Sequence, residues 1–178
     1  MRFADGRLIY IRRALLAVLI VFTAVFQHID GAVPKLFGVP AMLLIPLVVS
    51  VAMFERSMTG LMFGAFAGLL WDFAVVRGDG YFSVVLATVG FFTGTAVTYF
   101  VRNNIYSATL LASISVFICN VGYWLLFIMR KGYEGAFGVL WSYYLPSAIY
   151  TVAFIFLYYY LVKYIVKITT SRKNRSNY

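Results

Sequence analysis

The sequence predicts an all-α integral membrane protein, folded as one bundle of six transmembrane helices with both termini in the cytoplasm. Three observations lead to this prediction. The 178-residue chain is 63% hydrophobic and only 12% charged, whereas ordinary soluble domains carry about 25% charged residues. Its apolar residues fall into six stretches of roughly membrane-spanning length. Its basic residues are distributed unevenly between the two ends of these stretches.

The six stretches define the expected helices in chain order. A helix needs about 20 residues to cross the hydrocarbon core. The first stretch is shorter, but the long side chains of Arg12 and Arg13 can extend from it to the interface. No small-x-small cleavage site follows it, which favours a retained helix over a signal peptide. Pro40 and Pro46 lie inside or near the start of the second stretch, and the last stretch is long enough to tilt or to kink at Pro146. The predicted spans are Ala14–Ile29, Leu36–Phe54, Met58–Val76, Tyr81–Val101, Ile105–Met129 and Phe137–Ile165.

The basic residues predict the orientation of the bundle. With the N-terminus inside and six crossings, 11 of the 15 Lys and Arg residues lie in the cytoplasm. Such an excess of basic residues is typical of cytoplasmic loops. The inner set is Arg2, Arg7, Arg12, Arg13, Arg56, Arg102, Lys163, Lys167, Arg172, Lys173 and Arg175, and the outer set is Lys35, Arg77, Arg130 and Lys131.

The loops between the spans are too short for a folded domain, so residues 1–168 are expected to form a single transmembrane domain and residues 169–178 a basic cytoplasmic tail. The net charge is +9. Because the bases cluster next to apolar spans at the termini, they indicate anionic lipids as partners rather than nucleic acid. Cys119 is the single cysteine and His28 the single histidine. A disulfide or a multi-histidine metal site within the chain is therefore excluded, and no cofactor is expected.

The third span carries the most informative pattern, GLMFGAFAGLLWDF. Gly60, Gly64 and Gly68 recur every four residues, and Asp72 continues the series. Four residues turn about 400° around a helix of 3.6 residues per turn, so the glycines form one shallow groove. Another helix can approach closely along such a groove. The groove is expected either to pack only within the bundle or also to receive a helix of a partner protein, and the sequence leaves both alternatives open.

Asp72 is an acidic residue within a predicted span, where a carboxylate costs about 2.5–3.5 kcal/mol to insert. Two interpretations remain open. Asp72 acts either as a polar lock or ligand contact in the outer half of the bundle, or as a cap on the start of a neighbouring helix. Arg77 and Asn120 are its candidate polar partners. Gly80 belongs to the turn that follows and permits a positive φ there.

The pattern G-x-x-x-G-x-x-x-G-L-L-x-D with a following glycine resembles the MreD family of rod shape-determining membrane proteins. The similarity in length and helix order extends over about residues 8–165. Asn120 departs from the family, since the fifth helix of relatives often carries an acid there, whereas Pro146 suits the last helix. The residues that carry the motif are Gly60, Gly64, Gly68, Leu69, Leu70, Asp72 and Gly80.

This resemblance implies a non-catalytic scaffold of the bacterial cell-elongation machinery, located in the inner membrane. Members of the family associate with the bitopic protein MreC, which links to MreB filaments and to the synthases that build peptidoglycan. The implied binding or packing residues are Gly60, Gly64, Gly68, Asp72 and Gly80.

The alternative is a transport function. In helix count and small-residue grooves, the MreD family resembles the substrate-binding S-components of energy-coupling factor vitamin transporters. An S-component needs a roomy pocket with several convergent polar groups, and this chain offers Asp72, Arg77, Asn120 and few others. An enzyme is less expected, because general acid–base catalysis needs two positioned titratable groups.

Overall fold

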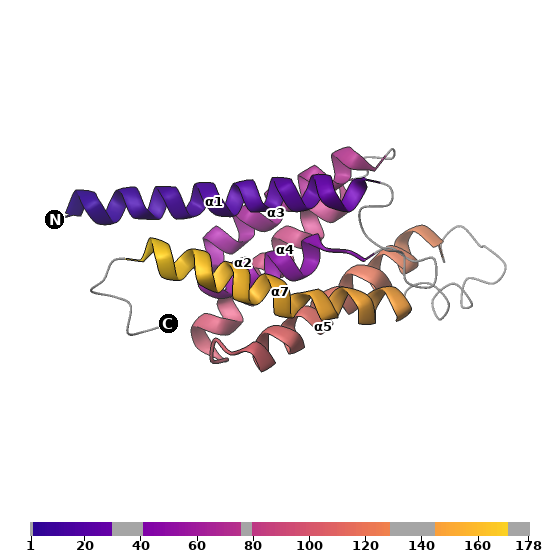
Figure 1. Ribbon diagram of the computed structural model, residues 1–178. Helices are drawn as coiled ribbons and strands as arrows, with labels where there is room; N and C mark the ends of the chain where they lie inside the picture. The colour runs from indigo at the N-terminus through magenta and orange to yellow at the C-terminus, as the bar shows by residue number, and fades with distance from the viewer. Residues whose placement is uncertain (1, 30–40, 76–79, 129–144, 171–178) are drawn as a thin grey trace.

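The structure, a computed structural model, describes residues 2–29, 41–75, 80–128 and 145–170 (Figure 1). The regular secondary structure of this part of the chain is entirely helical, and the part contains no strand. Five of its helices are long and apolar enough to cross a membrane, which makes the chain an all-helical multi-pass membrane protein. The elements are α1 (Arg2–His28), α2 (Leu44–Phe54), α3 (Ser57–Ala74), α4 (Tyr81–Tyr99), α5 (Ile105–Tyr123), the π-helical turn η1 (Trp124–Ile128) and α7 (Leu145–Thr169).

Helices α3, α4 and α5 agree with the predicted third, fourth and fifth spans to within a few residues, and η1 carries the fifth span on to Ile128. Two other boundaries differ from the prediction. Helix α1 begins at Arg2 rather than at Ala14, and its membrane-spanning part is Leu8–His28. The helix continues through Arg12 because this arginine has a counter-ion inside the bundle, namely Glu55.

Pro146 lies at the start of the described part of the last helix, so the predicted tilt or kink there stays a prediction. Helix α7 begins at Leu145, so the proline is its second residue. Its missing N–H is not needed in a first turn, and its fixed φ suits a helix start. The earlier part of the predicted sixth span, residues 137–144, lies outside the described residues.

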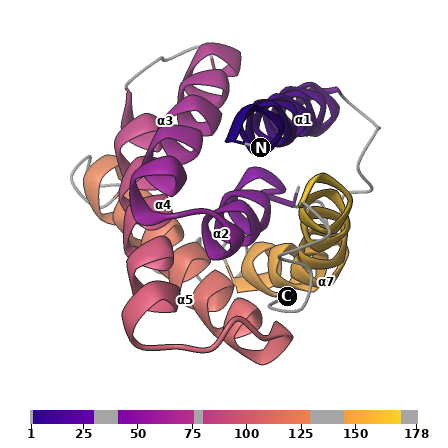
Figure 2. The same cartoon turned by 90° about the vertical axis from the view of Figure 1, so that its left-hand side faces the viewer.

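The second predicted span is also corrected. Helix α2 has 11 residues, about 16 Å of helix, whereas the hydrocarbon core is about 30 Å thick. Residues 36–40 lie outside the described part, and Ala41–Leu43 are not helical. In an end-on view α2 lies in the middle of the bundle, enclosed by α1, α3, α4, α5 and α7 (Figure 2). Its apolar residues therefore form the core of the bundle.

The start of α2 is capped by side chains from other helices. The amide of Leu44 donates to Oε1 of Gln27 in α1 at 3.0 Å, and the amide of Met42 donates to Oγ1 of Thr151 in α7 at 3.0 Å. Buried helix ends need such partners because water does not reach them. These bonds fix α2 between α1 and α7.

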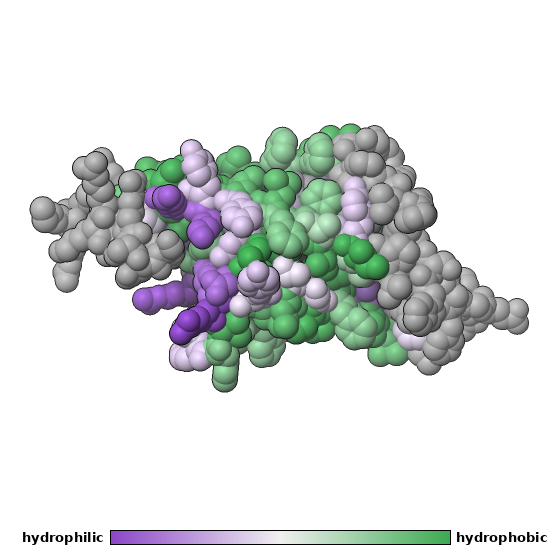
Figure 3. Space-filling view, turned by 60° about the horizontal axis from the view of Figure 1, so that its bottom comes forward, coloured by the Kyte–Doolittle hydropathy of each residue, from purple (hydrophilic) through white to green (hydrophobic). Residues whose placement is uncertain are grey.

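The outer surface of the bundle is apolar along its length and polar at one end (Figure 3). Helix α1 begins and α7 ends at this polar end (Figure 1). Large apolar side chains such as Phe73 and Phe92 are exposed on the sides of the bundle. In a membrane these residues face lipid, as composition predicts.

Candidate functional site

The glycine stripe of α3 packs directly against the backbone of α4. A Cβ added at Gly60 would lie 2.6 Å from the carbonyl oxygen of Gly90, which is closer than real Cβ contacts. A Cβ at Gly64 would collide with the Leu86 carbonyl, and one at Gly68 with the Phe82 carbonyl. Close backbone approach of this kind drives helix association where lipid offers no hydrophobic gain.

Helix α4 contributes glycines to the same interface. Gly90 faces the backbone of Gly60, and a Cβ at Gly94 would lie 2.8 Å from Cα of Ser57. Packing within the bundle is therefore the alternative that the structure shows for this groove. Helix α4 occupies the groove of Gly60, Gly64 and Gly68 in this arrangement, and the binding of a partner helix at this pair stays a prediction.

Asp72 caps the start of α4. Its Oδ1 accepts the amide of Phe82 at 3.2 Å, and its Oδ2 accepts the amide of Ser83 at 2.8 Å and also the Ser83 hydroxyl. The first amides of a helix have no partner within the helix, and their partial positive charge favours an anionic group. Of the two interpretations left open by the sequence, the structure supports the cap on a neighbouring helix.

Gly80 precedes α4 and makes this cap possible. It has a φ of 68°, in the left-handed region that glycine adopts most readily. Glycine has no side chain that could cap the helix, so the cap comes from α3 instead. Gly80 turns the chain so that α4 runs back along α3, with its first amides next to Asp72.

The two expected partners of Asp72 do not form this site. Within the described residues Asp72 bonds only to α4, so the expected hydrogen bond to Asn120 is not formed. Asn120 is buried on α5, and the amides and hydroxyl of α4 meet the acceptor needs of the carboxylate in its place. Arg77 lies outside the described residues.

Aromatic rings link this capped end to α5. The rings of Trp71 and Phe82 are stacked with centroids 4.1 Å apart, and Phe82 also stacks on Tyr123 at 5.8 Å. The Tyr81 hydroxyl donates to the carbonyl of Cys119 at 2.9 Å. The ends of α3, α4 and α5 are thus joined around the Asp72 carboxylate.

A second polar site, at the opposite end, was missed by the sequence reasoning. Nε of Arg12 in α1 lies 2.7 Å from Oε1 of Glu55, which lies between α2 and α3. Burial raises the pKa of Glu55 above its usual range, although the charges of Arg12 and Arg13 oppose this rise. The available signal was an acidic residue directly beside Arg56 at the end of an apolar span, near a predicted cytoplasmic Arg pair.

Asn103 connects the corner between α4 and α5 with two other helices at this end. Its Nδ2 donates to the carbonyl of Met53 in α2 at 3.1 Å, and the Tyr159 hydroxyl of α7 lies 3.3 Å from its carbonyl. Arg13 reaches the Thr59 hydroxyl of α3 at 3.5 Å. These contacts hold the polar ends of the helices together.

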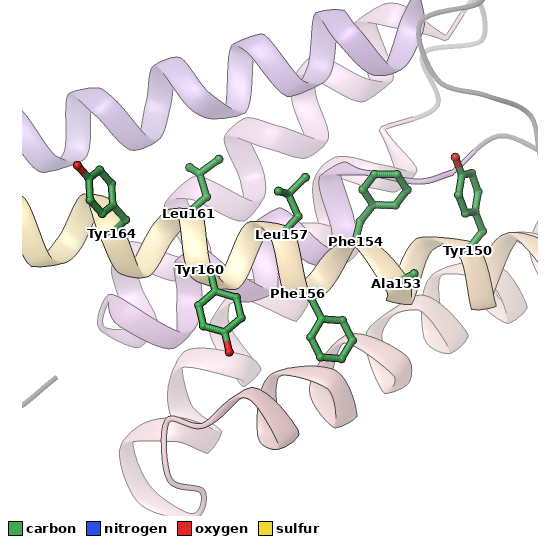
Figure 4. A pocket seen from close by; sticks show the side chains of 8 residues that line it. All are labelled: Tyr150, Ala153, Phe154, Phe156, Leu157, Tyr160, Leu161 and Tyr164. Carbon is green, nitrogen blue, oxygen red and sulfur yellow. The ribbon is translucent and has the colours of Figure 1, made fainter.

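Apolar grooves lie on the surface of the described part, and three of them are considered in turn. One, about 810 Å³, runs along α7 from Tyr150 to Tyr164, and its aromatic side chains extend to both sides of that helix (Figure 4). A second, about 360 Å³, separates α4 from α5. The third, about 540 Å³, follows the α3–α4 pair and is lined by Leu61, Ala65, Leu69, Ser83, Val84, Ala87, Thr88, Phe91 and Phe92.

The described residues contain no group of three or more His, Cys, Asp or Glu side chains able to hold a metal ion. Asp72 and Glu55 lie at opposite ends of the bundle, each engaged in the contacts given above. No family model, curated protein or solved structure matches the chain.

Proposed function

We propose that this chain is a non-catalytic membrane scaffold of the bacterial cell-elongation machinery, located in the inner membrane. It binds the transmembrane helix of MreC and thereby helps to couple MreB filaments to peptidoglycan synthases. The proposal rests on the resemblance of the Gly60-to-Gly80 segment to the MreD family. It is also supported by the packing of that segment, which joins α3 and α4 into one rigid pair.

The observation that carries the proposal is the 540 Å³ groove on the lipid-facing side of this pair. Small side chains, Ala65 from α3 and Ala87 from α4, are among its lining residues. Ser83 also lines the groove, and its hydroxyl is held by Asp72. Helices associate in membranes through small residues that allow close approach. A partner helix is therefore expected on this outer side, since α4 fills the glycine groove itself.

The alternative, a vitamin-binding S-component, is supported less well by the geometry. Ligand pockets for small molecules enclose most of the ligand and present convergent polar groups. The three grooves described above are open to the lipid and lined mainly by apolar side chains. Asp72, the expected ligand contact, is engaged with the start of α4.

The test is co-purification of the full chain with MreC from bacterial membranes. Wild type is expected to retain MreC. Ala65→Phe fills the α3–α4 groove and is expected to lower the retained MreC severalfold. Ala153→Phe makes the same change in the groove of α7 and serves as the matched control, with retention like that of wild type.

Failure of the wild-type chain to retain MreC would overturn the proposal. Retention that is lost with Ala153→Phe and kept with Ala65→Phe would place the partner on α7 instead. Tight binding of a vitamin by the purified chain would favour the transporter alternative.

A further inference from the structure

The most hydrophilic surface in Figure 3 gathers at one end of the bundle, and Figure 1 shows that α1 begins and α7 ends at this end. The Lys and Arg side chains that the structure describes lie on segments that meet there. Arg12 is largely buried and pairs with Glu55. The remaining ones are exposed or partly exposed. We call them the basic rim, and they are Arg13, Arg56, Arg102, Lys163 and Lys167.

Contacts between helices hold this rim together. Arg13 bonds to Thr59, one turn beyond Arg56, so α1 and α3 bring these two arginines to the same corner. Asn103 bonds to Met53 and is contacted by Tyr159, which places Arg102 beside the end of α2 and the middle of α7. The Lys163 ammonium lies 5.8 Å from the centre of the Tyr159 ring. The rim is therefore one fixed surface built from four parts of the chain.

Among the side chains that the structure describes, which begin at Leu8 on α1, no exposed carboxylate neutralises this surface. The acid at this end, Glu55, is buried, and its charge is balanced by Arg12. Arg13 and the other rim residues therefore present an excess of positive charge. This charge is suited to phosphate groups, which attract juxtamembrane Lys and Arg by about 1 kcal/mol for each basic residue.

Lipid-facing side chains adjoin three of the four parts of the rim. Met58 follows Arg56, Phe100 precedes Arg102 and Tyr164 follows Lys163, and all three are well exposed. Exposed apolar and aromatic side chains beside cations are typical of the level of lipid headgroups. A soluble acidic partner would not require this apolar border.

From this arrangement we propose that the basic rim binds the phosphate headgroups of anionic phospholipids, with Arg13 and Arg56 forming its strongest corner. This proposal is independent of the function proposed above, since it requires no protein partner.

The test is native mass spectrometry of the full chain in detergent with added phosphatidylglycerol or phosphatidylcholine. Wild type is expected to prefer phosphatidylglycerol. Arg13→Gln with Arg56→Gln is expected to reduce that preference roughly tenfold or more, given about 1 kcal/mol for each lost charge. Arg13→Lys with Arg56→Lys keeps the charge and is expected to retain most of the preference for phosphatidylglycerol. Lys35→Gln with Lys131→Gln removes two charges that the sequence predicts on the other side of the membrane, and it is expected to leave the preference for phosphatidylglycerol intact.

A measurement on wild type alone keeps the proposal testable if a variant does not fold. Raising the salt from 0.1 to 1 M shortens the Debye length from about 10 to 3 Å, and the preference is expected to fall while phosphatidylcholine binding stays constant. Equal binding of both lipids at low salt would overturn the proposal. An equal loss of this preference in the Arg13/Arg56 and the Lys35/Lys131 variants would also overturn it. Full displacement of the lipid by equimolar inorganic phosphate would overturn it as well.

Discussion

At the scale of single residues, Asp72 shows how a carboxylate can be accommodated inside a membrane bundle. The start of α4 offers amides that neither water nor the helix itself can satisfy. Asp72 accepts two of these amides and one hydroxyl. These bonds offset the cost of inserting the carboxylate, and they also remove the cost of leaving the amides unpaired. The residue is best understood as a structural cap, on which the shape of the α3–α4 groove depends.

This role predicts the effect of Asp72→Asn. One oxygen of the amide group still accepts, but its NH₂ group faces a backbone donor, so part of the cap is lost. We expect a loss of about 1–2 kcal/mol of stability, the usual size of a helix-cap effect. The measurement is the thermal unfolding midpoint in mild detergent.

Ser83→Ala is the control for this prediction, because it removes only the hydroxyl that Asp72 accepts and leaves both amides bonded. Its effect is expected to be smaller than that of Asp72→Asn. A larger effect of Ser83→Ala would show that the hydroxyl, rather than the helix start, is what Asp72 serves.

At the scale of elements, α3 and α4 form the most closely packed pair of helices in the described part. Glycines on both helices let the backbones approach, and the two ends of the pair are joined by hydrogen bonds. At one end Asp72 holds the start of α4. At the other, the hydroxyls of Thr95 and Ser57 lie 3.0 Å apart. The pair is therefore expected to behave as one rigid unit.

Gly64→Ala tests this packing. The new Cβ would collide with the backbone of Leu86 and Ala87, which cannot move aside as a side chain can. We expect α3 and α4 to separate slightly, at a cost of roughly 1–3 kcal/mol, as in other over-packed cores. A fall in the unfolding midpoint in detergent would show it.

Gly122→Ala provides the matched comparison on α5, since its Cβ would meet the end of the Tyr81 side chain rather than backbone. A smaller loss is expected there. If Gly64→Ala left the midpoint unchanged while Gly122→Ala lowered it, close backbone packing of α3 on α4 would not be what stabilises the pair.

At the scale of the whole molecule, the bundle is organised around the short helix α2. Gln27 and Thr151 bond the backbone at its start, and Asn103 bonds Met53 near its end. The Arg12–Glu55 pair then fastens α1 to the corner that follows α2. Helices far apart in the sequence are thus joined through one buried element.

A double-mutant cycle on the Arg12–Glu55 pair tests this connection. Arg12→Met leaves a buried carboxylate without its counter-ion, and we expect it to lower the free energy of unfolding by about 2 kcal/mol. This loss is below the usual range for buried pairs because Arg12 is partly exposed. Adding Glu55→Leu removes the unpaired charge and is expected to restore most of that stability. The unfolding midpoints of the four proteins give the coupling. Equal losses in Arg12→Met and in the double variant would show that the pair does not connect α1 to the core.

Much of the fold followed from local patterns in the sequence. Apolar stretches of spanning length predicted α3, α4 and α5 closely, because lipid requires long apolar helices whose backbone bonds are satisfied internally. The four-residue spacing of Gly60, Gly64 and Gly68 predicted a groove, since glycines at that spacing share one helix face. The turn at Gly80 was also predicted from a local property, because glycine tolerates a positive φ.

The tertiary structure decided which groups meet across those elements. Hydropathy does not distinguish an apolar helix that faces lipid from one enclosed by other helices, and so α2 was expected to be a full span. The sequence named Asp72 and the glycine groove but not what fills or bonds them, because those contacts join residues that only packing brings together. The same holds for Arg12 and Glu55, 43 positions apart in the chain, whose pairing depends on where α1 crosses the end of α2.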